Sequence, residues 1–152
     1  MKKTLLSVLL CCIFSFVFAQ NEVSVQDART VSKNYLSAVA PQSGITESDL
    51  TLKQTLTNED NEALLYIFTI RGGGFVFVSA SESVEPVLAY SLESEFLAEG
   101  CSYALNVYKE TINTAKSTVN NAAKAQWDRF RNYEPTRTQY ISSEVKPLLT
   151  ST

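Results

Sequence analysis

The chain has 152 residues, of which 13 are lysine or arginine and 16 are aspartate or glutamate, and it contains no histidine. The acidic balance argues against a nucleic-acid partner, because neutralising phosphates requires a basic face. Without imidazole, the chain lacks the usual base for a serine or cysteine nucleophile and the commonest side-chain ligand of zinc, so we predict no catalytic residues, no metal site and no cofactor.

Residues 1–19 have the three parts of a secretory signal peptide. Two lysines follow the initiating methionine, an apolar run covers residues 5–18, and Val17 and Ala19 occupy the positions that a signal peptidase reads. The run has 14 residues, fewer than the roughly 18 to 20 that a membrane-spanning helix needs, which argues against an anchor. We therefore expect a secreted or periplasmic bacterial protein with no membrane association after cleavage. N-terminal sequencing of exported material, expected to begin near Gln20, would test this.

The mature chain, residues 20–152, has a length typical of one domain and a net charge of −5. Cys11 and Cys12 lie in the signal peptide, so Cys101 has no partner for an internal disulfide. Because no imidazole is present to activate it, we interpret Cys101 as a structural or incidental cysteine rather than a reactive thiol.

The first predicted element of the mature chain is a helix over residues 24–40. Apolar side chains recur there at spacings of three and four residues, which places them on one face. Ser24 is the expected N-cap, with Asp27 three positions on, and Pro41 and Gly44 are expected to end the helix.

Four strands are predicted next, over residues 50–57, 63–71, 75–78 and 87–91. Polar and apolar residues alternate in the first, and the others are short runs rich in β-branched and aromatic side chains. Short reversals between them imply antiparallel pairing. In the third strand, the valines at 76 and 78 should face one side of the sheet and the phenylalanines at 75 and 77 the other.

Two of the reversals invite other interpretations. The glycines at 72–74 lie between two strands with no helix after them, so they predict a hairpin turn rather than a phosphate-binding loop. The acidic residues Glu59, Asp60 and Glu62 lack the spacing of a calcium loop, so they predict a solvated turn.

The last predicted element is one long helix from about Ser102 to Arg131, with Ile112 and Trp127 on a single apolar stripe. Residues 132–152 predict an extended polar tail. The fold class is therefore α+β, in which an antiparallel four-stranded sheet is flanked by an N-terminal helix and a long C-terminal helix, both packed on one face. We predict that residues 20–131 form the functional domain.

Three segments of the predicted sheet together resemble the propeptides of streptopain-family cysteine proteases. They are Tyr-Ile-Phe at 66–68, Gly-Gly-Phe-Val-Phe-Val-Ser at 73–79 and Pro-Val-Leu-Ala-Tyr-Ser at 86–91. The family pattern is an aromatic strand, a glycine turn, a Gly-Phe-Val-x-Val-Ser strand and a Pro-x-Leu-Gly-Tyr-Ser strand, so Ala89 departs from a glycine. Lys-Pro-Leu-Leu-Thr at 146–150 is similar to the junction that precedes the mature protease in many relatives.

The resemblance implies a protein that binds a streptopain-type cysteine protease and inhibits it by occluding the active-site cleft. A zymogen would continue beyond Thr152 into a catalytic domain, so a stand-alone inhibitor, a truncated zymogen fragment and a non-inhibitory exported binding module stay open. Loops on rigid scaffolds carry function, so the loop expected before the long helix is the first choice for entering the cleft and the glycine hairpin is the second. The candidate residues are Glu99, Gly100, Cys101 and Ser102 in the first loop and Gly72, Gly73 and Gly74 in the hairpin.

Overall fold

The computed structural model describes residues 22–135, so the predicted signal peptide and nearly all of the predicted tail lie outside the described residues and stay predictions. Strands β1 to β4 form one sheet in that order, and every neighbouring pair is antiparallel. This confirms the α+β class. The elements are α2 (Val25–Val39), η1 (Pro41–Ser43), η2 (Glu47–Asp49), β1 (Leu50–Thr57), β2 (Ala63–Ile70), β3 (Phe75–Ser79), β4 (Val87–Ser91), α3 (Ala98–Ala115) and α4 (Asn121–Arg131).

Helix α2 begins and ends where the sequence predicts. The hydroxyl of Ser24 accepts a hydrogen bond from the backbone N–H of Asp27 at 3.1 Å, which satisfies one free donor of the first turn. The helix stops before Pro41, and Gly44 adopts a left-handed conformation after it. The apolar side chains of α2 that recur every three or four residues are mostly buried, as their spacing predicts. Helix α2 therefore presents one apolar face to the sheet.

Both faces of the sheet carry a hydrophobic core. Val76 and Val78 of β3 pack into one core with Phe68 of β2, whereas Phe77 packs into a second core with Ile67. The alternation predicted for β3 is therefore confirmed, and it divides the interior of the protein into two layers.

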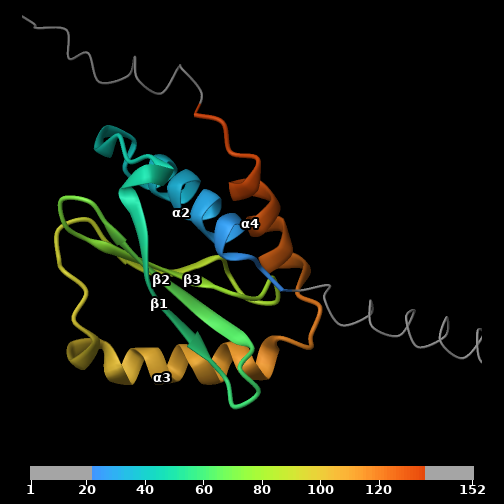
Figure 1. The fold of residues 1–152 in the computed structure, drawn as a ribbon. Coiled ribbons are helices and arrows are strands. Elements are labelled where there is room, and N and C mark those ends of the chain that lie inside the picture. Colours follow the sequence, from blue (N-terminus) through green and yellow to red (C-terminus); the bar gives the residue numbers. More distant parts are fainter. Residues whose placement is uncertain (1–21, 136–152) are drawn as a thin grey trace, which may run out of the picture.

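The helices cover both faces, so the prediction that they pack on one face is wrong. Figure 1 shows α2 and α4 side by side on one side of the sheet and α3 on the other. Helix α3 buries Leu105 and Ile112 against the second core, while α4 buries Trp127 and Phe130 in the first. The nearly continuous apolar runs of β2 and β3 are the pattern of strands buried on both faces, and the prediction overlooked this signal.

The predicted single helix from 102 to 131 is also wrong, because residues 116–120 separate α3 from α4. The side chain of Asn120 accepts hydrogen bonds from the N–H groups of Ala122 and Ala123, both at 3.1 Å, and so caps a new helix. At the end of α3, the hydroxyl of Ser83 donates to the carbonyl of Thr118 at 2.6 Å. The break sends Ile112 and Trp127, predicted on one stripe, to opposite sides of the sheet.

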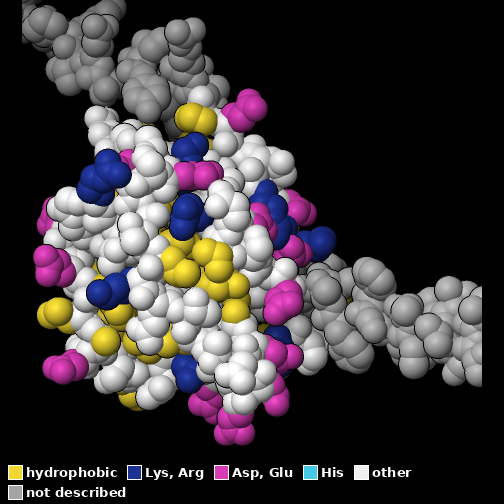
Figure 2. Space-filling model, in the orientation of Figure 1, with side chains coloured by type: hydrophobic (Ala, Val, Ile, Leu, Met, Phe, Trp, Pro, Cys, Tyr) yellow, Lys and Arg dark blue, Asp and Glu magenta, His cyan; other side chains and the backbone are white. Residues whose placement is uncertain are grey.

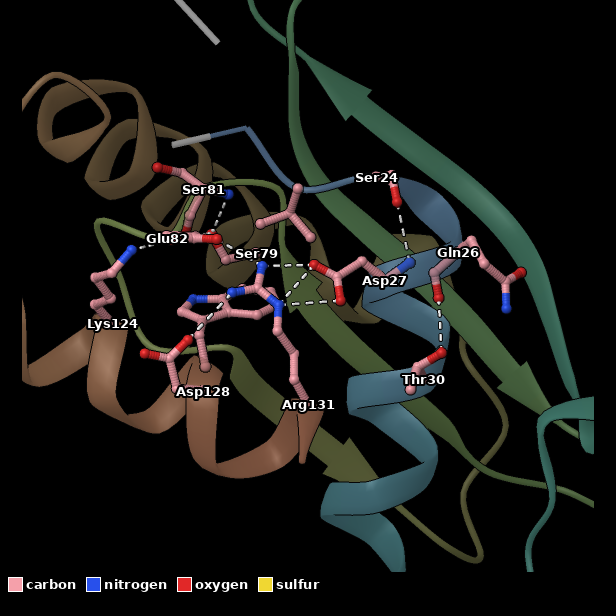
Figure 3. Close-up of polar contacts among 12 residues, drawn as sticks. Ser24, Gln26, Asp27, Thr30, Ser79, Ser81, Glu82, Lys124, Asp128 and Arg131 are labelled. Atoms are coloured by element: carbon pink, nitrogen blue, oxygen red, sulfur yellow. Dashed lines mark hydrogen bonds and ion pairs between the residues drawn. The ribbon is translucent and has the colours of Figure 1, made fainter. Parts of the chain in front are cut away.

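Polar contacts fasten α4 to the rest of the first layer (Figure 3). The guanidinium of Arg131 donates to the carboxylate of Asp27 on α2 at 2.5–3.1 Å and to Glu82 in the β3–β4 loop at 2.6 Å. The buried ring of Trp127 donates its N–H to the carbonyl of Val84 at 2.9 Å. The side-chain amide of Asn34 donates to the carbonyl of Phe130 at 2.6 Å.

The ion pairs of Arg131 hold three separate segments of the chain together. Its hydrogen bonds to Asp27, followed by those to Glu82, raise its pKa above the already high ordinary value, against the effect of partial burial. The guanidinium also lies 5.2 Å from the centre of the Trp127 ring. Asp27, predicted to support the start of α2, therefore also anchors the last helix.

We expect Trp127→Ala to lower the free energy of unfolding by about 3–5 kcal/mol, because it empties a fully buried indole site and leaves the carbonyl of Val84 without its donor. Val119→Ala is the matched control, since that side chain is 80% exposed in the same half of the chain, and it should change stability by no more than about 0.5 kcal/mol. Urea unfolding followed by circular dichroism measures both. Equal stabilities of the two variants would show that α4 is not part of the cooperative unit.

Candidate functional site

The two predicted candidate segments lie at the same end of the sheet. Strand β3 pairs with β4 so that Phe75, just after the glycine hairpin, is opposite Ser91, at the start of the connection to α3. Both segments therefore lie at the left of the molecule in Figure 1, away from the β1–β2 turn. We call this part, residues 71–74 and 91–102, the hairpin end.

The hairpin itself depends on glycine at three consecutive positions. Gly72, Gly73 and Gly74 have φ values of +90°, +118° and +101°, which side-chain-bearing residues rarely adopt. A Cβ atom on Gly74 would lie 2.5 Å from the carbonyl oxygen of Ser91, so the backbones of the two segments are in direct contact. Gly72 faces open space, so the tip of the hairpin is a bare backbone exposed to solvent.

The first-choice segment is not a loop, so that part of the prediction is wrong. Helix α3 begins at Ala98, and Glu99, Gly100, Cys101 and Ser102 form its first turns. The true connection is residues 92–97. The predicted start of the helix at Ser102 is too late, because Gly100 interrupts the run of helix-favouring residues.

The side chains of this first part of α3 point in different directions. Cys101 packs against the second core and is partly buried, whereas Glu99, Gly100 and Ser102 are exposed. The N-cap residue, Leu97, makes no side-chain capping hydrogen bond. The structure therefore brings the exposed part of the first candidate segment to the same end as the hairpin, and it turns the thiol inward.

Aromatic rings fix the connection to the sheet. The ring of Phe96 lies 6.0 Å from that of Phe75 and 5.6 Å from that of Phe77, both with edge-on geometry. The hydroxyl of Ser91 accepts hydrogen bonds from the backbone N–H groups of Glu93 and Ser94, at 3.3 and 3.0 Å. The hairpin end is thus a set of exposed residues on a rigid apolar base.

One ion pair flanks the hairpin on the side of β1. Arg71 lies 3.2 Å from the carboxylate of Asp49, and its backbone N–H donates to the carbonyl of Asp49 at 2.8 Å. Hydrogen bonds from the hydroxyl and then the N–H of Thr46, with a smaller contribution from Arg71, hold the pKa of Asp49 below its ordinary value. Asp49 stays ionised and keeps the side of the hairpin in place at neutral pH.

The hairpin end carries carboxylates, hydroxyls and exposed backbone, a set of groups suited to binding another protein. No group of three or more metal-ligating side chains occurs within residues 22–135, and none of the helices described there is long and apolar enough to cross a membrane. A polar groove of about 700 Å³ lies at the opposite end, between the β1–β2 turn and α3. Asn58, Glu59, Asp60, Lys109 and Lys116 are among the residues that line it.

The sequence matches the family described as Spi protease inhibitor over residues 20–115. The chain belongs to this family. No curated protein and no solved structure matches it. By its family, the chain is a protease inhibitor, and the family implies a protease as its partner.

The Spi match covers the whole sheet and the complete hairpin end, and it stops at Ala115, the last residue of α3. Helix α4 lies beyond the match, although it supplies Trp127 and Phe130 to the first core. The matched part of the chain therefore contains both predicted candidate segments. The connection at 92–97 was not among the predicted site residues, although the apolar residues Phe96 and Leu97 within its acidic surroundings mark it.

We expect the hairpin to respond differently to a methyl group at its two ends. Gly72→Ala adds a Cβ in open space at a positive φ and should cost about 1–2 kcal/mol of stability. Gly74→Ala also forces a Cβ into the backbone of Ser91 and Leu92 and should cost about 1–3 kcal/mol more. Thermal or urea unfolding of both variants measures the difference. Equal losses would show that the hairpin does not lie against the start of the connection.

Proposed function

We propose that the protein is exported and inhibits a streptopain-type cysteine protease by seating the hairpin end over the active-site cleft. The Spi match and the streptopain-propeptide pattern at 66–91 both support a protease of this type as the target. The observation that carries the proposal is the juxtaposition of the glycine hairpin and the residues leading into α3 at one end of a sheet whose two faces are buried.

The form of the hairpin suits occlusion without cleavage. The bare backbone at Gly72 and Gly73 can enter a narrow cleft, because no side chain widens it. Attack on a peptide bond requires the reacting atoms to be held in a near-attack geometry. Three successive positive φ values, fixed by the hydrogen bonds between Ile70 and Gly73 and between Ile70 and Gly74, keep these peptide bonds in a tight turn.

The energetic requirement is moderate. Micromolar inhibition corresponds to about −8 kcal/mol of binding free energy. An interface of standard size buries about 1,600 Å² in total, and a few well-packed anchors supply most of its affinity. The rigid base of the hairpin end lowers the entropy lost on binding, because Phe75, Phe77 and Phe96 already order it.

The test is a titration of the exported protein into a streptopain-type protease and, as a control enzyme, a papain-type protease, each assayed with a fluorogenic peptide. Competitive inhibition of the first at micromolar concentration or below, and little inhibition of the second, is the expected result. A folded protein that inhibits no streptopain-type protease at tens of micromolar would contradict the proposal.

A variant pair locates the blocking element. Gly72→Asn adds a side chain at the exposed tip, where asparagine tolerates a positive φ, and should raise the inhibition constant at least about tenfold, a loss of about 1.4 kcal/mol. Asp60→Ala, in the exposed turn at the opposite end, should leave it unchanged. If the wild-type protein inhibits and both variants inhibit equally well, the hairpin is not the blocking element.

A further inference from the structure

Helix α3 exposes apolar side chains on the side that faces away from the sheet. Cys101, Leu105 and Ile112 face the second core, and positions 103 and 107 lie roughly opposite them around the helix. Tyr103 is 83% exposed and Val107 42% exposed, and Leu97, just before the helix, is 67% exposed. Large apolar residues that cluster on a surface in this way mark an interaction site.

The segment that leads into α3 is acidic in sequence. No lysine or arginine occurs between Arg71 and Lys109 in the sequence. Glu93, Glu95 and Glu99 are exposed in this interval, and none of the ion pairs formed within residues 22–135 involves them. Figure 2 shows hydrophobic and acidic side chains next to each other at the lower left of the view, over the N-terminal end of α3.

We propose that the outer face of α3, which runs from Leu97 and Glu99 of the hairpin end to Tyr103 and Val107 beyond it, extends the contact and binds the target protease beside its cleft. This inference rests on the proposed function. The partner surface it fits is an apolar hollow that accepts Tyr103, with lysine or arginine side chains at its rim to meet Glu95 and Glu99. Tyrosine is enriched among the residues that dominate interface energies.

Position in the fold supports the protease as the occupant. The outer face of α3 begins at the hairpin end, because Leu97 follows Phe96, which packs on Phe75, the residue after the hairpin. A protease seated on this end therefore borders Leu97 and Glu99. By contrast, Val119 is 80% exposed but lies in the α3–α4 connection, near Lys116 and Lys124 and away from the glutamates.

Charge argues against a second copy of this chain as the occupant. A symmetric dimer brings the same patch of both subunits together. Such a contact would place Glu95 and Glu99 of one copy close to the same residues of the other, and like charges repel at that distance. A basic surface on a different protein has the complementary charge.

The two kinds of residue in this face should act on different rate constants. The glutamates attract a basic partner before contact, so they raise the association rate, and salt screens this effect. Tyr103 packs against the protease only after the complex has formed, so its contribution slows dissociation. Rate measurements at two ionic strengths therefore separate these contributions from a change in folding.

The experiment compares two test variants of the exported protein with two matched controls, using surface plasmon resonance on a streptopain-type protease whose inhibition by the wild-type protein is measured in parallel. The test variants are Tyr103→Gln and the double variant Glu95→Gln with Glu99→Gln. The control for the first is Val119→Gln, which removes an equally exposed apolar side chain. The control for the second is Glu59→Gln with Asp60→Asn, which makes the same change in charge at the opposite end of the sheet.

Tyr103→Gln should raise the dissociation constant at least about tenfold, mainly through faster dissociation. At about 50 mM salt, the Glu95/Glu99 variant should associate severalfold more slowly than the wild-type protein. At about 500 mM salt, the two proteins should associate at nearly the same rate. Both controls should behave like the wild-type protein. All six substitutions in these four variants are at exposed positions, and circular dichroism checks that the fold is kept.

The outcomes separate this inference from the proposed function. A wild-type protein that does not inhibit the protease contradicts the proposed function itself. A wild-type protein that inhibits, with both test variants equal to it at both salt concentrations, overturns the α3 contact and leaves the function standing. Sedimentation showing a wild-type dimer that Tyr103→Gln dissociates would also overturn it, because the face would then bind a second copy.

Discussion

Burial of both faces of the central strands β2 and β3 is the constraint on which the rest of the structure depends. Val76 and Val78 face the layer of α2 and α4, while Phe77 faces α3, so neither face of these two strands is free for a partner. Binding is confined to the ends of the sheet, its edges and the outer surfaces of the helices. The hairpin end and the outer face of α3 are surfaces of this kind that meet at Leu97 and Glu99; the first has bare backbone at its glycine tip and the second carries Tyr103 and Val107.

The covering layers are held by different interactions. Helix α3 is attached mainly by apolar contacts of Leu105 and Ile112, whereas α4 adds the Arg131 ion pairs to the burial of Trp127. Because α4 lies beyond the Spi match but completes the first core, the folding unit is longer than the matched segment. The sheet that carries the hairpin is thereby held between two packed layers, and an inhibitor that is already ordered loses less entropy on binding.

Much of the fold follows from local sequence signals, and the errors come from long-range packing. The Ser24 cap, the four strands and the glycine turn were predictable because each depends on neighbouring residues. The break at Asn120 was not, because alanine-rich segments on both sides favour helix, and only the cap and the contact of Ser83 with Thr118 decide it. At the site, the glycines were identified correctly, but the contact between Gly74 and Ser91 depends on strand pairing and so could not be read from spacing.

Amide hydrogen exchange of the exported protein, measured alone and in complex with a streptopain-type protease, tests the central claim most directly. The account predicts slower exchange at residues 71–74 and 92–107 in the complex, with no change in the β1–β2 turn at residues 58–62, which lies at the opposite end of the sheet. Protection confined to the β1–β2 turn or to α2 and α4, with the hairpin end unchanged, would contradict the claim that the protease binds at this end.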